Sequence, residues 1–199
     1  MFHLPLLHFI FKITSMVYKD KTEIKTLRSR TVYQNRWMTV REDEIERLSG
    51  AKGLYSVVEK PHFAIIIPVH GGQVYMVEQY RYPVGERQLE FPQGTWDDEP
   101  GVDPLTLAAG ELKEETGLTA SSMQYVGFQY LAYGMCNQGY HIYLASELTE
   151  GKQQLDPEEE GLTVHQLSLD ELDEKIISGQ IKDASTCNAL GLARLKGFL

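Results

Sequence analysis

Three acidic side chains stand close together in the stretch LTLAAGELKEETGL, residues 105–118. Glu111, Glu114 and Glu115 occupy positions i, i+3 and i+4, so on a helix they share one face with Cβ atoms about 5–6 Å apart. With an effective dielectric constant of about 20, one carboxylate pair at about 4 Å costs on the order of 4 kcal/mol. A divalent cation relieves this repulsion, and oxygen ligands without His or Cys suit Mg²⁺ or Mn²⁺. The alternative is a solvated acidic helix face.

The composition limits the classes of function. The chain has 199 residues, of which 42% are hydrophobic, and a net charge of −9, which predicts one domain with a sizeable core. This acidity argues against nonspecific binding to nucleic acid or to an anionic membrane, but a bound cation still allows a phosphate substrate. Two cysteines, Cys136 and Cys187, are too few for a disulfide framework or a zinc cluster, which favours a cytoplasmic location.

The first 16 residues, MFHLPLLHFIFKITSM, are apolar but interrupted by Pro5, His8 and Lys12. A membrane span needs about 20 mostly apolar residues. A signal peptide needs a basic start and a small-residue cleavage site. We therefore predict a disordered leader over residues 1–16, or a true start at Met16.

The elements that must position the glutamates follow from periodicity and turn residues. Alternating and apolar runs predict strands over residues 31–40, 54–58, 63–69, 73–80, 88–91, 123–132, 140–145 and 164–167. A helix is expected to begin after Asp103 and Pro104 and to end at Gly117. Two more helices are predicted over residues 169–177 and 184–195, after a polar loop over 151–161. The expected class is α+β, with a mixed sheet between helices.

The segment from Gly94 to Leu118 resembles the signature of the Nudix hydrolases, G-x5-E-x7-R-E-U-x-E-E-x-G-U, where U is a bulky aliphatic residue. The run ELKEETGL, residues 111–118, matches its closing half in register. The first part is two residues longer than the pattern, so Glu99 stands only near the first glutamate. Gly110 stands where the pattern has arginine, and a glycine inside a helix costs about 1 kcal/mol relative to alanine.

The resemblance extends over nearly all of residues 17–199. Within the family, the chain is similar to the ADP-ribose and nucleotide-sugar pyrophosphatase branch. The stretches that carry it are EQYRYP at 78–83, EFPQG at 90–94 and GQIKDAST at 179–186. It implies a Nudix-type α/β/α sandwich over residues 61–199. It also implies an N-terminal strand region over residues 17–60 that builds a homodimer.

The resemblance further implies roles for individual residues. Glu111 and Glu115 would hold Mg²⁺ or Mn²⁺, with Glu114 and the Gly94 carbonyl completing the site. Glu160 is expected to activate the attacking water as catalytic base, with Glu158 as the second choice.

Three further residues are candidates for substrate binding. The guanidinium of Arg81 suits two phosphate oxygens of a diphosphate. Glu90 would support metal or substrate, unless it is an exposed residue at a strand edge. Trp37 is a candidate to stack on a base, although an aromatic residue in an alternating strand more often belongs to a core or a dimer contact.

These features predict metal-dependent hydrolysis of the pyrophosphate bond of a nucleoside diphosphate sugar, such as ADP-ribose or GDP-mannose. The products would be a nucleoside monophosphate and a sugar phosphate. One alternative is a Nudix hydrolase of nucleoside triphosphates or dinucleoside polyphosphates. Another is a Nudix-fold binding module without catalysis. The sequence lacks a P-loop, a G-x-S-x-G elbow and a G-x-G-x-x-G motif, which argues against kinases, serine hydrolases and Rossmann enzymes.

Overall fold

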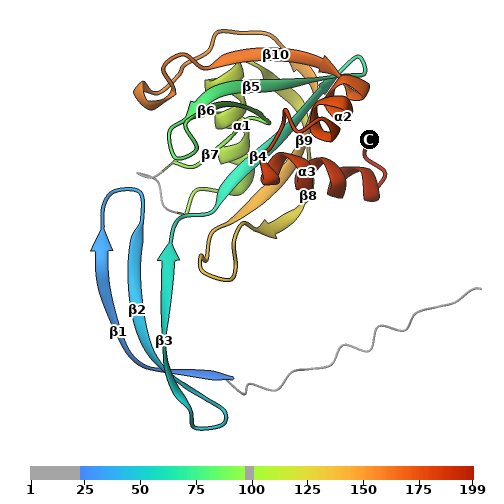
Figure 1. Cartoon of the computed structure of the whole chain (residues 1–199). Helices are drawn as coiled ribbons and strands as arrows, with labels where there is room; N and C mark the ends of the chain where they lie inside the picture. Colours follow the sequence, from blue (N-terminus) through green and yellow to red (C-terminus); the bar gives the residue numbers. More distant parts are fainter. Residues whose placement is uncertain (1–22, 97–100) are drawn as a thin grey trace, which may run out of the picture.

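The computed structural model describes residues 23–96 and 101–199, so the predicted leader over 1–16 and Glu99 lie outside the described residues. At the N-terminal end, a separate antiparallel sheet of three strands consists of β1 (Ile24–Gln34), β2 (Thr39–Arg47) and β3 (Lys52–Glu59) (Figure 1). The end of β3 is joined to the loop before β9 by a hydrogen bond of 2.8 Å from the Val58 amide to the Met135 carbonyl. The small sheet is thereby tied to the rest of the chain next to the start of β4.

The larger sheet has a mixed arrangement. Its strands are β4 (Phe63–His70), β5 (Gln73–Arg81), β6 (Glu86–Glu90), β7 (Gln93–Gly94), β8 (Thr119–Tyr130), β9 (Gly139–Thr149) and β10 (Thr163–Ser168). The order is β10-β5-β4-β9-β8, with β6 paired to β5 and β7 paired to β4. Strands β4 and β9 run parallel, and the other pairs described are antiparallel. The predicted α+β class with a mixed sheet is confirmed.

Helices cover both faces of this sheet (Figure 1). Side chains alternate between the faces along β4, so Ile66 packs with α1 (Pro104–Thr116), whereas Ile65 packs with α2 (Leu169–Ile177) and α3 (Ala184–Leu195). Residues 64–67 are fully buried because both faces are covered. The predicted α/β/α sandwich is therefore present, and α2 and α3 have the predicted bounds.

The predicted strand over residues 31–40 is wrong at its centre. The chain turns there between β1 and β2, and the Asn35 side chain accepts hydrogen bonds of 2.9 Å from the amides of Trp37 and Met38. An asparagine that bonds to the following backbone in this way replaces strand pairing with a turn. The aromatic and β-branched pattern alone did not reveal this.

Both ends of α1 are formed as predicted. Asp103 accepts a hydrogen bond of 3.1 Å from the Thr106 amide, and Gly117 adopts the left-handed conformation at φ 75°. A β-carbon on Gly117 would lie 2.8 Å from the Gly151 carbonyl oxygen, which belongs to the loop after β9. That loop is also bound by a hydrogen bond of 2.9 Å from the Gln154 amide to the Glu114 carbonyl. Gly117 therefore ends the helix and gives the loop a place to dock.

Replacing Gly117 with alanine should destabilise the protein more than Gly179→Ala. Gly179 has the same φ of 75° after α2, but a β-carbon there would meet nothing within 4 Å. Gly179→Ala should cost about 1–2 kcal/mol for the left-handed conformation. Gly117→Ala should cost about 1–3 kcal/mol more, because the loop backbone must move. Urea unfolding measures both, and equal losses would contradict the docking role of Gly117.

Candidate active site

Two glutamates of α1 are buried together. Glu111 and Glu115 have exposed fractions of 4% and 1%. Oxygen atoms of Glu111, Glu115 and Glu159 all lie within 4.8 Å of one another. Among the residues that the structure describes, no Lys, Arg or His forms an ion pair with any of these carboxylates. The cluster thus brings together three carboxyl groups, two of them shielded from water, without a basic partner.

This environment changes how the carboxyl groups ionise. Burial, helped by the negative charges of Glu114 and Glu159, raises the pKa of Glu111 to about 8. Burial and the neighbouring Glu111 raise the pKa of Glu115 well above its ordinary value, and burial also raises that of Glu159. A buried carboxylate needs a proton or a cation to offset its charge. A cluster of hard oxygen donors fits Mg²⁺ or Mn²⁺.

The segment 93–96 contacts each glutamate that sequence analysis placed on this helix face. The Gln93 amide donates a hydrogen bond of 2.9 Å to Glu115 Oε2. A β-carbon on Gly94 would lie 2.6 Å from Cδ of Glu111, so only glycine fits beside that carboxylate. Trp96 Nε1 donates a hydrogen bond of 3.1 Å to Glu114 Oε2. Gly94 was predicted from the motif, whereas the contacts of Gln93 and Trp96 were not.

The acidic loop does not bring the predicted glutamate to the cluster in this structure. Its 3-10 turn, η1 (Pro157–Glu159), directs Glu159 inward, and the Glu159 side chain accepts a hydrogen bond of 2.9 Å from the Asp156 amide. Glu160 is exposed. Glu158 is exposed too and lies 3.7 Å from Arg36, in the turn between β1 and β2. A run of three glutamates gives no periodic signal for which one points inward, so only the turn geometry distinguishes them.

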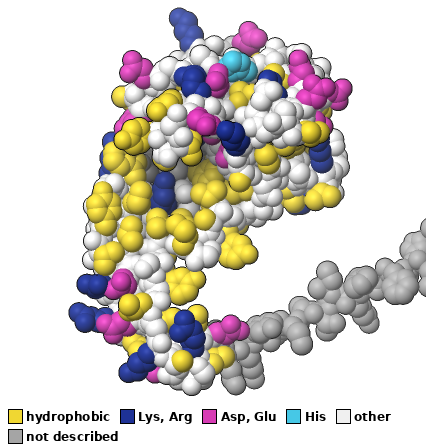
Figure 2. Space-filling view, viewed as in Figure 1, with side chains coloured by type: hydrophobic (Ala, Val, Ile, Leu, Met, Phe, Trp, Pro, Cys, Tyr) yellow, Lys and Arg dark blue, Asp and Glu magenta, His cyan; other side chains and the backbone are white. Residues whose placement is uncertain are grey.

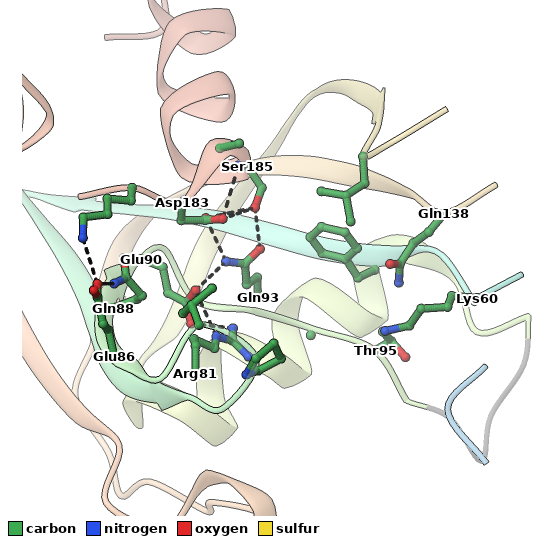
Figure 3. Close-up of a pocket in the computed structure, with 17 residues that line it drawn as sticks. Lys60, Arg81, Glu86, Gln88, Glu90, Gln93, Thr95, Gln138, Asp183 and Ser185 are labelled. Carbon is green, nitrogen blue, oxygen red and sulfur yellow. Dashed lines mark hydrogen bonds and ion pairs between the residues drawn. The ribbon is translucent and has the colours of Figure 1, made fainter. Parts of the chain in front are cut away.

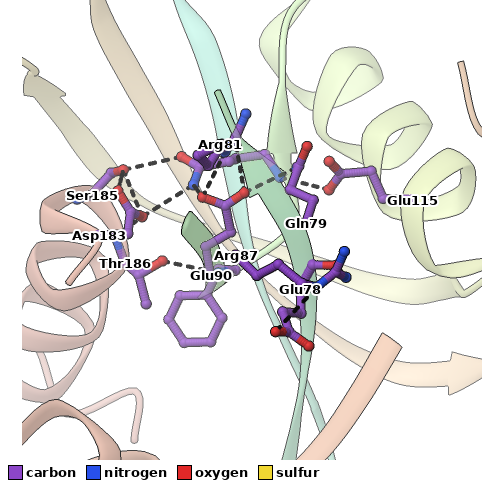
Figure 4. Close-up of polar contacts among 11 residues, drawn as sticks. Glu78, Gln79, Arg81, Arg87, Glu90, Glu115, Asp183, Ser185 and Thr186 are labelled. Atoms are coloured by element: carbon purple, nitrogen blue, oxygen red, sulfur yellow. Dashed lines mark hydrogen bonds and ion pairs between the residues drawn. The ribbon is translucent and has the colours of Figure 1, made fainter. Parts of the chain in front are cut away.

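Arg81 forms an ion pair with the buried Glu90 beside the cluster (Figure 4). The distance from Arg81 Nη2 to Glu90 Oε1 is 2.5 Å, and Gln79 donates a further hydrogen bond of 3.0 Å to the same oxygen. Glu90 has an exposed fraction of only 3%, so it is not an exposed edge residue. Burial raises the pKa of Glu90, although Arg81 opposes this effect. The pair holds the Arg81 guanidinium in a fixed position.

Gln93 joins this ion pair to the start of α3. Its side-chain amide donates hydrogen bonds of 3.2 Å to Glu90 and 3.1 Å to Asp183, and it accepts one of 3.1 Å from Ser185 (Figure 4). Burial by itself would raise the pKa of Asp183, but hydrogen bonds from Thr186, Ser185 and Gln93 hold it below its ordinary value. Asp183 therefore accepts as an anion, and Gln93 links the substrate side of the network to Glu115.

A cavity of about 810 Å³ opens next to these residues (Figure 3). Its polar lining includes Arg81, Glu90 and Gln93, and its apolar lining includes Phe63 and Leu131. Gln93, Gly94 and Thr95 line it as well, so one wall of the cavity is the segment that contacts the glutamates. A volume of this size suits a small organic ligand. Among the predicted substrate residues, Trp37 is absent from the lining and lies 45% exposed in the turn between β1 and β2.

Comparisons with protein families identify the family to which the chain belongs. A model described as the NUDIX domain matches residues 60–185, and one described as the nucleoside diphosphate sugar hydrolase N-terminal domain matches residues 24–58. The chain belongs to the Nudix family. The predicted Nudix hydrolase is confirmed, and the match to the larger domain includes α1 with its glutamates.

Individual relatives agree with this assignment. The chain is 29% identical over 180 residues to an ADP-ribose pyrophosphatase of Bacillus subtilis, covering 89% of this chain and 96% of the relative. It is 32% identical over 163 residues to an ADP-ribose pyrophosphatase of Mycobacterium tuberculosis, covering 80% and 77%. The crystal structure of an ADP compounds hydrolase matches with a TM-score of 0.78 at 23% identity, covering 90% of this chain and 97% of the other, which supports the fold alone.

A search of the described helices finds none with the length and apolar character needed to cross a membrane. The two cysteines, Cys136 and Cys187, are both free thiols.

The stability of the metal-free protein should fall as pH rises from about 5 to 8.5. The folded state binds a proton at Glu111 with a pKa of about 8, above the ordinary 4.5, so it loses this advantage when the pH passes through that range. Since one pKa unit corresponds to about 1.4 kcal/mol, the loss should be several kcal/mol. Urea unfolding in the presence of a chelator measures it. Glu111→Gln should make the plot of unfolding free energy against pH flatter. Glu150→Gln, at an exposed position, is the control for removing one charge. Parallel plots for Glu111→Gln and the unmodified protein would contradict this expectation.

Proposed function

We propose that this Nudix hydrolase cleaves the pyrophosphate bond of a nucleoside diphosphate sugar of the ADP-ribose type, giving a nucleoside monophosphate and a sugar phosphate. One observation carries the proposal: the cavity and the carboxylate cluster share the wall formed by residues 93–95. A ligand in the cavity therefore lies against the segment that contacts Glu111 and Glu115. The two ADP-ribose pyrophosphatases among the relatives support the same substrate class.

The lining of the cavity supports a ligand with an anionic centre and apolar ends. Arg81, Lys60 and Lys182 are the basic side chains that could contact a diphosphate, and two of them are already paired, Arg81 with Glu90 and Lys182 with Glu86. Phe63 and Leu131 offer apolar surface for a base.

The donor set supports a divalent cation. Glu111 and Glu115 would hold Mg²⁺ or Mn²⁺, with Glu114 and the Gly94 carbonyl as further oxygen ligands. Such an ion would neutralise diphosphate charge and would make the attacking water easier to deprotonate. Arg81, held by Glu90, orients the diphosphate so that one phosphorus atom faces the attacking water.

A carboxylate of the acidic loop is the base in this proposal. Water attacks phosphorus, the bridging P–O bond breaks, and the water proton passes to the carboxylate. Glu159 is favoured because its oxygen lies with those of Glu111 and Glu115.

The homodimer implied by the resemblance stays a prediction. The N-terminal sheet carries exposed apolar side chains of the kind that such an interface buries: Ile24, Leu27, Val32, Tyr33, Trp37, Leu54 and Tyr55. Figure 2 shows hydrophobic side chains gathered where this sheet approaches the larger domain. This surface supports a contact with a second copy of the chain.

Hydrolysis of ADP-ribose in the presence of Mg²⁺ or Mn²⁺ should be measurable and should be lost in Glu115→Gln. Removing one ligand of the cation costs several kcal/mol of transition-state stabilisation, which corresponds to more than about a hundredfold in rate. The assay is release of monophosphate from a panel of ADP-ribose, GDP-mannose, nucleoside triphosphates and dinucleoside polyphosphates. Circular dichroism controls for folding. Faster turnover of the triphosphates, or retained turnover in Glu115→Gln, would overturn the proposal.

Single glutamine variants of the acidic loop separate the structural assignment from the sequence-based one. Glu159→Gln should lower kcat by about 10²–10⁴-fold, as expected for a general base. Glu158→Gln and Glu160→Gln are matched controls with the same chemical change in the same loop, and they should retain most of the activity. Rate measurements with ADP-ribose test this. A larger loss in Glu160→Gln would restore the original prediction and would mean that the loop rearranges when substrate binds.

A further inference from the structure

Gly110 lies in the middle of α1, where a glycine weakens a helix, and the structure shows what occupies the space of the missing side chain. The six-membered ring of the Trp96 indole lies directly against it. A β-carbon on Gly110 would fall 2.6 Å from Cη2 of Trp96 and still nearer to Cζ2. Any other residue at position 110 would have to displace the ring.

The same indole reaches a carboxylate of the active-site helix. Gly110 and Glu114 are four residues apart, so they lie on one face of α1 one turn from each other. The ring covers Gly110, and its Nε1 donates a hydrogen bond of 3.1 Å to Glu114 Oε2. Trp96 is also partly buried against the apolar cluster that contains Leu107 and Ala108 of α1, which limits the movement of the ring.

We propose that Trp96 is a positioning residue for Glu114 and that Gly110 provides the space that the indole needs. Glu114 is only half-buried, so without this donor its side chain would be free to adopt other rotamers. Trp96 acts through Glu114 and does not itself touch the reacting atoms. The proposal rests on the proposed function only in treating Glu114 as a ligand of the cation.

A double-mutant cycle on the metal-free protein tests the packing. Gly110→Ala should lower the melting temperature when Trp96 is present, because the new methyl group overlaps the ring. In a Trp96→Ala background the same change should leave the melting temperature unchanged or raise it, since alanine favours the helix. An equal decrease in both backgrounds would overturn the packing claim. This measurement needs no hydrolysis, so it separates failure of this inference from failure of the proposed function.

Trp96→Phe tests the positioning role, because it keeps an aromatic ring but removes the Nε1 donor, together with part of the indole that packs on Gly110. The dissociation constant for Mn²⁺, measured by calorimetry, should rise about three- to tenfold, as expected for the loss of one hydrogen bond to a charged ligand. The melting temperature of the metal-free protein should fall by a few degrees, because the smaller ring leaves part of the space beside Gly110 empty, so Mn²⁺ binding is measured well below it. Trp37→Phe is the matched control for Mn²⁺ affinity only, because Trp37 lies in the turn between β1 and β2. Unchanged Mn²⁺ affinity in Trp96→Phe would overturn the positioning role.

Discussion

The burial of like charges on α1 is the constraint on which the rest of this structure depends. Glu111 and Glu115 are almost fully shielded from water, and Glu159 is added to them by a distant loop. Such an arrangement is unfavourable unless protons or a cation offset the charge. The fold therefore has to hold α1 firmly on the sheet. It does so through an apolar face that includes Leu107, Ala108 and Leu112.

The segment 93–96 joins this helix to the cavity. Its backbone and side chains contact Glu111, Glu114 and Glu115, while residues 93–95 line the space for a ligand. Gln93 extends the connection to Glu90 and Asp183, on elements that lie before and after it in the chain. Binding of a ligand and binding of a cation thus involve the same short stretch. Because the segment has both roles, its residues are strongly constrained, including the glycine at position 94.

Much of this was predictable from patterns that depend on neighbours in the chain. The N-cap at Asp103 and the left-handed Gly117 follow from local backbone chemistry, and the structure has both. The helices over 169–177 and 184–195 were predicted as well, and the structure has both with these bounds. The turn at Asn35 was missed because a side chain that bonds to the following amides overrides strand propensity. The burial of Glu90 could not be predicted from the sequence either, because it depends on contacts with Arg81, Gln79 and Gln93.

The order of residues along the chain was enough to predict the resemblance to the Nudix family, the α+β class and the helix that carries the three glutamates. Spacing along a helix fixes which side chains share a face. Which glutamate of the acidic loop meets them depended instead on how distant segments pack. Glu158, Glu159 and Glu160 are chemically alike, and a 3-10 turn docked near the end of α1 selects the middle one. The glycine at position 110 is explained in the same way, because the Trp96 ring packs against it and leaves no room for a side chain. Contacts between segments distant in the chain leave no periodic trace in sequence, so packing had to reveal them.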